Sequence, residues 1–338
     1  MKASILFLCY NQASYVCEAI RSAMAQDYGN LELVVCDDGS VDDTRAIIEK
    51  ELKNCPPHIT VVYACPETNI GLLANFNQGM AACSGDVVFA AAGDDISMPD
   101  RVSTVMEVFG NHLNCMMVST NFVKIDDNGQ LLATSSKRQV DEKISYGSNP
   151  KDIYAGTRIP GASAAYRCSL VRIFGPLNLG KHAEDGGYWV RALLAGEVHY
   201  LAKPLVKYRV HTRNLSNYAK VENSSVARLR YLKVMLFKQH DWRQYEKDIF
   251  RAVDEAIISR EFARHLCVVI RRKREKNRLK RLSIAAVPWP LWFASARRVM
   301  ACHGYSPSML WEIIRVHFRM RASEKKRARR WKQKFINR

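Results

Sequence analysis

Two adjacent carboxylates, Asp94 and Asp95, come directly after an apolar run. The run covers residues 87–92, and only Gly93 separates it from the pair. Neighbouring carboxylates repel each other, and at the end of a buried strand they are costly unless a cation or hydrogen-bond donors offset their charge. Hard divalent cations prefer oxygen ligands of this kind. The pair therefore predicts a Mg²⁺ or Mn²⁺ site. The structural alternative is a cap on the following helix.

Polar clusters follow the preceding apolar runs in the same way. Tyr10 follows the first run and offers an aromatic face to a nucleobase. Asp37 and Asp38 follow the second run, and carboxylates there can accept hydrogen bonds from a base N–H or from ribose hydroxyls. A nucleotide diphosphate bridged by a metal ion would satisfy all of these groups together. The alternatives are a core position for Tyr10, and a turn with a helix cap for residues 37–43.

Apolar runs and helical periodicity alternate through the first part of the chain. Ser14 is the predicted N-cap of the first helix. The alternation predicts a parallel sheet with helices on both faces, and ligands of such sheets bind beyond the carboxyl ends of the strands. The polar clusters lie at those ends, so we expect them to form one site. Strands are predicted at 4–10, 31–37, 59–65, 86–92 and 115–125, and helices at 14–27, 42–52, 72–83 and 100–112.

The net charge of +18 is distributed unevenly along the 338 residues. Residues 1–218 hold 20 Lys and Arg against 23 Asp and Glu, whereas residues 219–338 hold 31 against 10. The excess positive charge therefore belongs to the last part of the chain, and eight of the eleven residues at 271–281 are basic. Such asymmetry indicates an anionic partner for this part of the molecule.

The ten cysteines form no C-x-x-C pair, so zinc-ribbon and redox motifs have no support. Several of them lie in apolar runs, where cysteine behaves as a small hydrophobic residue, and we expect a reducing compartment. The N-terminal apolar run is short and has no cleavage-like site, and no stretch reaches the roughly 18 apolar residues of a membrane span. These observations predict a cytoplasmic location.

Four segments carry a resemblance to a known family. They are residues 4–44, 69–102, 184–196 and 208–216, and they include the DDGS, AGDD, ED and YRVH motifs. In order and spacing they resemble the inverting nucleotide-sugar glycosyltransferases of family 2. The resemblance implies the A-type glycosyltransferase fold, which is a Rossmann-like mixed α/β sheet with helices on both faces. It also implies a nucleotide-sugar donor, most commonly a UDP-sugar.

The resemblance assigns roles to the residues of the donor site. Tyr10 and Asp38 would hold the base, with Asp37 beside them. AGDD stands where the family has its D-x-D motif, in which one carboxylate meets the ribose and the other holds Mg²⁺ or Mn²⁺. Because Ala92 replaces the first Asp of the strict pattern, Asp94 and Asp95 both remain metal-ligand candidates.

His211, in the YRVH motif, resembles a further metal ligand of several relatives. The alternatives are a hydrogen bond to the diphosphate, or a role in ordering its own loop. Arg209, Arg213, Asn214 and Ser216 are either diphosphate contacts or ordinary loop residues.

Inversion at the anomeric carbon is a single displacement, so a base must accept the acceptor's proton. Asp185, in the ED motif, matches the catalytic base of the family. Its alternative is a carboxylate that only benefits from a helix N-terminus. Trp189 and Arg191 are expected to be packing residues of that helix.

These inferences predict a catalytic domain at 1–218 and a basic, mainly helical extension at 219–338. We expect a metal-dependent transferase of cell-surface polysaccharide synthesis, such as lipopolysaccharide or capsule, acting on a saccharide or lipid-linked acceptor. The extension suits an anionic membrane surface at the inner face of the cell membrane, and its alternative is a solvated helical region. Nucleic acid is disfavoured as a partner because no nucleic-acid-binding fold accompanies the charge. The alternative function is a non-catalytic binding protein with a degraded transferase domain.

Overall fold

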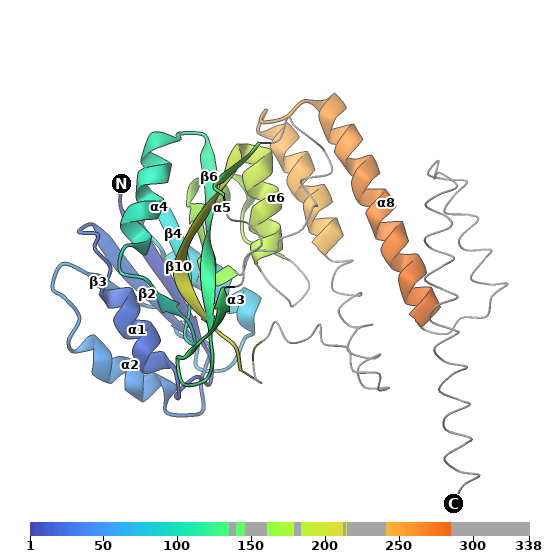
Figure 1. The fold of residues 1–338 in the computed structure, drawn as a ribbon. Coiled ribbons are helices and arrows are strands. Elements are labelled where there is room, and N and C mark those ends of the chain that lie inside the picture. Colours follow the sequence, from blue (N-terminus) through green and yellow to red (C-terminus); the bar gives the residue numbers. More distant parts are fainter. Residues whose placement is uncertain (135–139, 146–160, 179–183, 212–213, 215–240, 285–338) are drawn as a thin grey trace, which may run out of the picture.

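The computed structural model describes residues 1–134, 140–145, 161–178, 184–211, 214 and 241–284. These residues build one mixed sheet in the order β3-β2-β1-β4-β9-β6-β10-β5, with β7 paired to β6 and β8 paired to β10 (Figure 1). The strands are β1 (Ala3–Cys9), β2 (Leu31–Asp37), β3 (Thr60–Tyr63), β4 (Val87–Ala92), β5 (Ile96–Ser97), β6 (Cys115–Ile125), β7 (Leu131–Thr134), β8 (Glu142–Ser145), β9 (Ala164–Arg167) and β10 (Glu197–Arg209).

Helices cover both faces of the sheet. One core cluster joins α1 (Val16–Met24), α2 (Thr44–Leu52) and α4 (Arg101–Asn111) to one face. The other cluster joins α3 (Leu72–Ala82), α5 (Ser169–Phe174) and α6 (Asp185–Ala195) to the opposite face, and it extends into a helix at 241–254 and into α8 (Arg260–Ile284). The central strands are apolar toward both layers because both of their faces are buried. The predicted α/β sheet with helices on both faces is confirmed.

The parallel pattern holds for β3, β2, β1 and β4 and then breaks. β9 enters between β4 and β6 and runs antiparallel to both, so the expectation of a parallel sheet from the alternation alone was wrong, whereas the mixed sheet implied by the resemblance is present. The five predicted strands and four predicted helices all form.

Ser14 does not cap the first helix, contrary to the sequence prediction. α1 begins at Val16 with Tyr15 before it, and no side chain caps that end. Instead, the carbonyl oxygen of Gln12 accepts hydrogen bonds of 2.9 Å from the N–H groups of Tyr15 and Val16. A backbone carbonyl oxygen, and not the hydroxyl of Ser14, therefore accepts the hydrogen bonds at the start of α1.

The register of the strands brings the polar clusters to one edge. Cys9 of β1 pairs with Asp37 of β2, and Leu8 pairs with Ala92 of β4, so the residues that follow these strands share the carboxyl edge. The strand order reverses direction between β1 and β4, which is where ligands bind in open α/β sheets. At its far end β10 pairs with β5, directly after Asp95, so the chain returns to the same edge.

The predicted domain boundary at 218 lies outside the described residues, as do residues 285–338 of the predicted extension. Residues 271–281 fall within α8. Figure 1 shows the helix at 241–254 between α6 and α8, and Tyr245, Ile249 and Leu266 share a core cluster with α6. None of the helices among the described residues has the length and hydropathy needed to cross a membrane.

Candidate active site

Asp94 and His211 meet at the end of β4. Nε2 of His211 lies 2.9 Å from Oδ2 of Asp94, although the two residues are 117 positions apart. Both side chains are largely buried. The imidazole and the carboxylate therefore form a hydrogen-bonded pair that joins the residues after β4 to those after β10.

The donor chemistry of this pair fits a divalent metal ion. The 2.9 Å separation is that of a hydrogen bond or ion pair, and a carboxylate oxygen and an imidazole nitrogen are both ligand types for Mg²⁺ or Mn²⁺. Among the described residues, no group of three His, Cys, Asp or Glu side chains gathers into a metal site. These two residues alone would not complete the coordination of an ion.

Asp95 has a different environment from its neighbour. Its Oδ1 accepts a 2.8 Å hydrogen bond from the backbone N–H of Arg209. Burial, followed by the charge of Asp94, raises the pKa of Asp95 well above its usual range, and Arg209 and Arg101 act in the opposite direction. The structure therefore directs Asp95 toward protein groups and leaves Asp94 beside the imidazole.

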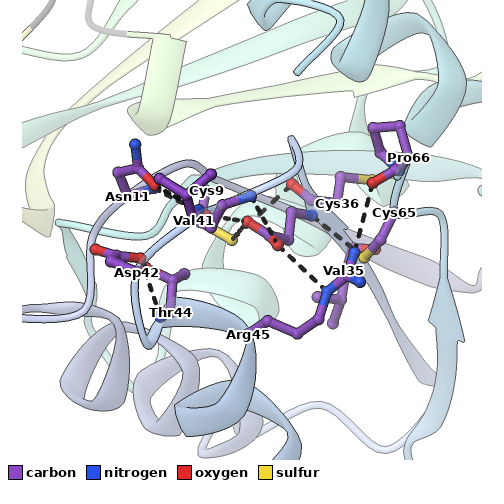
Figure 2. A network of polar contacts seen from close by, with 12 residues as sticks. Cys9, Asn11, Val35, Cys36, Val41, Asp42, Thr44, Arg45, Cys65 and Pro66 are labelled. Carbon is purple, nitrogen blue, oxygen red and sulfur yellow. Dashed lines mark hydrogen bonds and ion pairs between the residues drawn. The ribbon is translucent and has the colours of Figure 1, made fainter. Parts of the chain in front are cut away.

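Asp37 lines a pocket of about 250 Å³. Its carboxylate accepts hydrogen bonds from the hydroxyl and backbone N–H of Ser40, and Nε of Arg45 lies 3.5 Å from Oδ2 (Figure 2). Arg45 is half exposed, so this ion pair is weak and can rearrange around a ligand. The pocket is lined by Val35, Asp37, Arg45, Ile48, Glu49, Tyr63 and Cys65.

Asp38 organises the loop that precedes α3. Its two oxygens accept hydrogen bonds from the backbone N–H groups of Ile70, at 2.8 Å, and Gly71, at 3.0 Å, and from the Asn69 amide at 3.1 Å. Burial raises the pKa of Asp38, and these donors partly offset the shift. Between Asp38 and this loop Gly39 has a φ of 67°, and a Cβ there would lie 2.6 Å from the carbonyl carbon of Thr68. The expected tight turn therefore requires glycine.

Tyr10 is 44% exposed, so it is not a core residue. The next residue, Asn11, has a φ of 51°. Its backbone N–H donates to Ser40 Oγ, and its side-chain oxygen accepts from the N–H of Val41, both at 2.9 Å (Figure 2). These bonds join the loop after β1 to the loop after β2, and the ring of Tyr10 remains exposed beside them.

Asp185 begins α6, as the sequence predicts for either of its interpretations. Burial raises the pKa of Asp185 to about 6, and the backbone N–H of Gly186 donates to its Oδ1 at 2.7 Å. Burial and the neighbouring charge of Asp185 also raise the pKa of Glu184. A partly buried carboxylate with a pKa of about 6 is still mostly ionised at neutral pH and is suited to accept a proton.

The helix at 241–254 packs beside the start of α6, close to Asp185. A Cβ on Gly186 would lie 2.9 Å from the hydroxyl oxygen of Tyr245, and Asp185 contributes to the raised pKa of that phenol. One turn further along α6, Arg191 is fully buried and forms an ion pair with Asp248 at 3.0 Å. Trp189 and Arg191 are buried packing residues, as expected.

Sequence reasoning assigned Arg209 to the diphosphate or to a loop, and the structure contradicts both interpretations. Arg209 is 1% exposed, and its donors are taken up by protein groups. The amide of Asn214 donates to the Arg209 carbonyl oxygen, and its oxygen accepts the His211 N–H, so Asn214 orders this turn. Arg213 and Ser216 lie outside the described residues.

Arg101 was not identified from the sequence. It is 3% exposed, donates to the Ala90 carbonyl oxygen at 2.8 Å, and interacts electrostatically with Asp95 and Tyr166. Its position near the start of a helix gave no signal of this role.

Comparison with known proteins places this geometry in context. The model of Glycosyl transferase family 2 matches residues 4–173, which is half of the chain. The chain belongs to this family. An uncharacterised glycosyltransferase of Nostoc is 28% identical over 63% of this chain and 66% of its own length. The chondroitin synthase of Escherichia coli is 31% identical over 38% of this chain and 18% of its own length. The match thus spans less than two thirds of either relative.

The fold comparison agrees with the family. The crystal structure of S. aureus TarS 1–349 in complex with UDP-GlcNAc has a TM-score of 0.55 and 19% identity, and the match covers 89% of each chain. The A-type glycosyltransferase fold expected from the resemblance is therefore confirmed.

Proposed function

We propose that this glycosyltransferase is a metal-dependent, inverting enzyme that moves a sugar from a UDP-sugar to an acceptor hydroxyl. The observation that carries the proposal is the Asp94–His211 pair at the strand-order reversal, with Tyr10 and Asp38 along the same edge. The UDP-GlcNAc named for TarS supports uridine as the base. The chondroitin synthase among the relatives supports a polysaccharide product.

Each site residue has a role in this proposal. Tyr10 stacks on the base, Asp37 and Asp38 position the nucleoside, and Asp94 with His211 holds Mg²⁺ or Mn²⁺. The ion, when bound, stabilises the negative charge of the departing diphosphate.

Asp185 acts on the acceptor side of the reaction. Its carboxylate accepts the hydroxyl proton as that oxygen attacks the anomeric carbon, and the sugar–phosphate bond breaks on the opposite face, which inverts the configuration. Asp95 differs from Asp94 in acting through the Arg209 backbone, so it positions the loop.

The extension and its surroundings complete the proposal. The basic segment at 271–281 places the enzyme at an anionic cytoplasmic membrane surface, where lipid-linked acceptors are found. We expect a reducing compartment from the cysteine pattern of the sequence.

A panel of nucleotide sugars assayed for turnover with Mn²⁺ and with excess EDTA tests this function. Asp185→Asn keeps the shape of the side chain and removes its basicity, so we expect near-normal UDP binding and turnover lowered by about 100-fold or more. Asp94→Asn should abolish the metal-dependent turnover. Asp95→Asn should retain more activity than Asp94→Asn. Undiminished turnover in EDTA would contradict the metal, and donor binding without turnover of any sugar would favour a non-catalytic binding protein.

A further inference from the structure

Arg209 is one of the largest fully buried side chains among the described residues, and it lies at the last position of β10. A buried guanidinium is costly unless each of its donors has a partner. Its partners therefore indicate what the structure gains from it.

One end of Arg209 is bound to the Asp94–Asp95 turn. Its Nε donates to the Asp94 carbonyl oxygen at 3.0 Å, and its backbone N–H donates to Asp95 Oδ1 at 2.8 Å. Both residues of the motif are thus fixed by a single residue of another strand.

The other end of Arg209 reaches two separate elements. Nη1 donates to the carbonyl oxygens of Asp126 and Asp127, at 3.1 and 3.0 Å, in the turn after β6. Nη2 donates to Oε2 of Glu18 on α1 at 2.7 Å. Every guanidinium nitrogen therefore donates to protein, which is why a second role as a diphosphate contact does not fit.

Tyr15 links the same group to the imidazole of His211. The Arg209 guanidinium carbon lies 4.9 Å from the centre of the Tyr15 ring, and the rings of Tyr15 and His211 are also 4.9 Å apart. The Tyr15 hydroxyl donates to Asp127 Oδ1 at 2.6 Å. The imidazole is therefore held against a ring that Arg209 itself supports.

We propose that Arg209 is a positioning residue that locks α1 and the turn after β6 onto the Asp94–Asp95 turn and thereby fixes the separation of Asp94 and His211. This inference rests on the proposed function, because it concerns how that metal-binding pair is held. His211 follows Arg209 by two residues, so movement of the guanidinium displaces the backbone that carries the imidazole.

The planar fork of arginine is needed because its partners lie in different directions. A lysine at 209 would keep the charge but would present a single ammonium group to carbonyls and a carboxylate that lie on several sides of it. Arg209→Lys is therefore expected to fold less stably and to hold the Asp94–His211 pair loosely.

The test measures Mn²⁺ affinity by electron paramagnetic resonance on the full chain, with saturating UDP as the nucleotide probe. We expect Arg209→Lys to weaken Mn²⁺ binding by about tenfold or more, which corresponds to about 1.4 kcal/mol. Arg191→Lys is the matched control, since it changes an equally buried arginine away from the motif and should lower the melting temperature without changing Mn²⁺ affinity.

Glu18 provides a second variant that does not threaten the fold, because its side chain is 61% exposed. Glu18→Ala should weaken Mn²⁺ binding by a few-fold, and Glu18→Gln should recover part of the loss by restoring an acceptor. Arg21→Gln on the same helix is its control, because Arg21 pairs with Glu51 of α2 and not with Arg209.

The outcomes separate this inference from the proposed function. Mn²⁺ affinity within twofold of the parent in both Arg209→Lys and Glu18→Ala would overturn the positioning role and leave the metal site in place. A parent chain that binds no Mn²⁺ in the presence of UDP would overturn the metal in the proposed function, and this inference with it.

Discussion

Asp248→Ala is expected to destabilise the fold, although the residue lies well outside residues 4–173, which match the family model. Asp248 is 2% exposed and makes a two-bond ion pair with the fully buried Arg191 of α6, at 3.0 and 3.2 Å. Removing the carboxylate leaves a buried guanidinium without its counter-charge.

The magnitude follows from what Arg191 retains. Breaking a buried ion pair by removing one partner costs about 3–5 kcal/mol. Arg191 also donates to the carbonyl oxygens of Phe174, Gly175 and Pro176, at 3.3, 2.7 and 3.3 Å, and the variant keeps these bonds. We therefore expect the lower end of the range, about 3 kcal/mol.

Burial raises the pKa of Asp248 even with Arg191 beside it. Ionising this carboxyl is thus harder in the folded chain than in the unfolded chain, so the pair fixes a geometry more than it adds net stability. Replacing both partners, as in Arg191→Met with Asp248→Leu, should therefore recover most of the stability lost by Asp248→Ala.

Equilibrium denaturation in urea measures the free energy of unfolding of each variant. Arg251→Ala is the matched control, because it breaks the exposed pair with Glu255 on the same helix and should cost less than about 0.5 kcal/mol. If Asp248→Ala lowers the free energy of unfolding by less than about 1 kcal/mol, the ion pair does not couple the helix at 241–254 to α6 as expected.

Three further predictions follow from other parts of the site and the sheet. The pKa of Asp185 is raised to about 6 and the base must be ionised, so turnover should rise with pH through about 6, and a rise centred near 4 would contradict the burial argument. Burial raises the pKa of Glu32, but hydrogen bonds from Lys2, Ser4 and Ser84 outweigh it and lower the pKa from 4.5 to about 2. The stability that this carboxylate contributes should therefore be present above pH 4.5 and lost as the pH falls toward 2, and Glu32→Gln should flatten that slope in acid denaturation. Asn11→Gly tolerates the positive φ and loses only the side-chain hydrogen bond to Val41, whereas Asn11→Ala loses that bond and also disfavours the positive φ. Calorimetry with UDP should therefore show the larger loss of affinity for Asn11→Ala. Equal affinities of the two variants would exclude the loop geometry as the cause.

The strands and helices of the sheet core were predictable because their signals are local. β2 and β6 have the predicted boundaries, since long β-branched and apolar runs specify a buried strand without reference to the rest of the chain. The direction of β9 was not predictable from alternation, because no local pattern distinguishes an antiparallel insertion from a parallel strand.

Within the site, the residue types were visible in the sequence and their partners were not. The pairing of Asp94 with His211 joins positions 117 apart, and only the family resemblance brought them together before the structure did. The roles of Arg209 and Arg101 depend on burial, which a basic residue in the sequence does not reveal, since most arginines lie at the surface.

The two adjacent carboxylates of the motif are made unequal by the turn that holds them. The Asp95 N–H donates to the Ala92 carbonyl oxygen at 3.2 Å, so the chain reverses there and the two side chains enter different surroundings. Burial and the charge of Asp94 raise the pKa of Asp95 well above its usual range, because Arg101 and Arg209 offset its charge only in part. Asp94 has the imidazole of His211, which is a neutral or cationic partner according to its protonation and also a metal ligand. The turn therefore gives the two adjacent carboxyl groups different partners, the Arg209 backbone for Asp95 and the His211 imidazole for Asp94. This division lowers the repulsion between them at a buried strand end, and only Asp94 is left beside a residue type that binds metal ions.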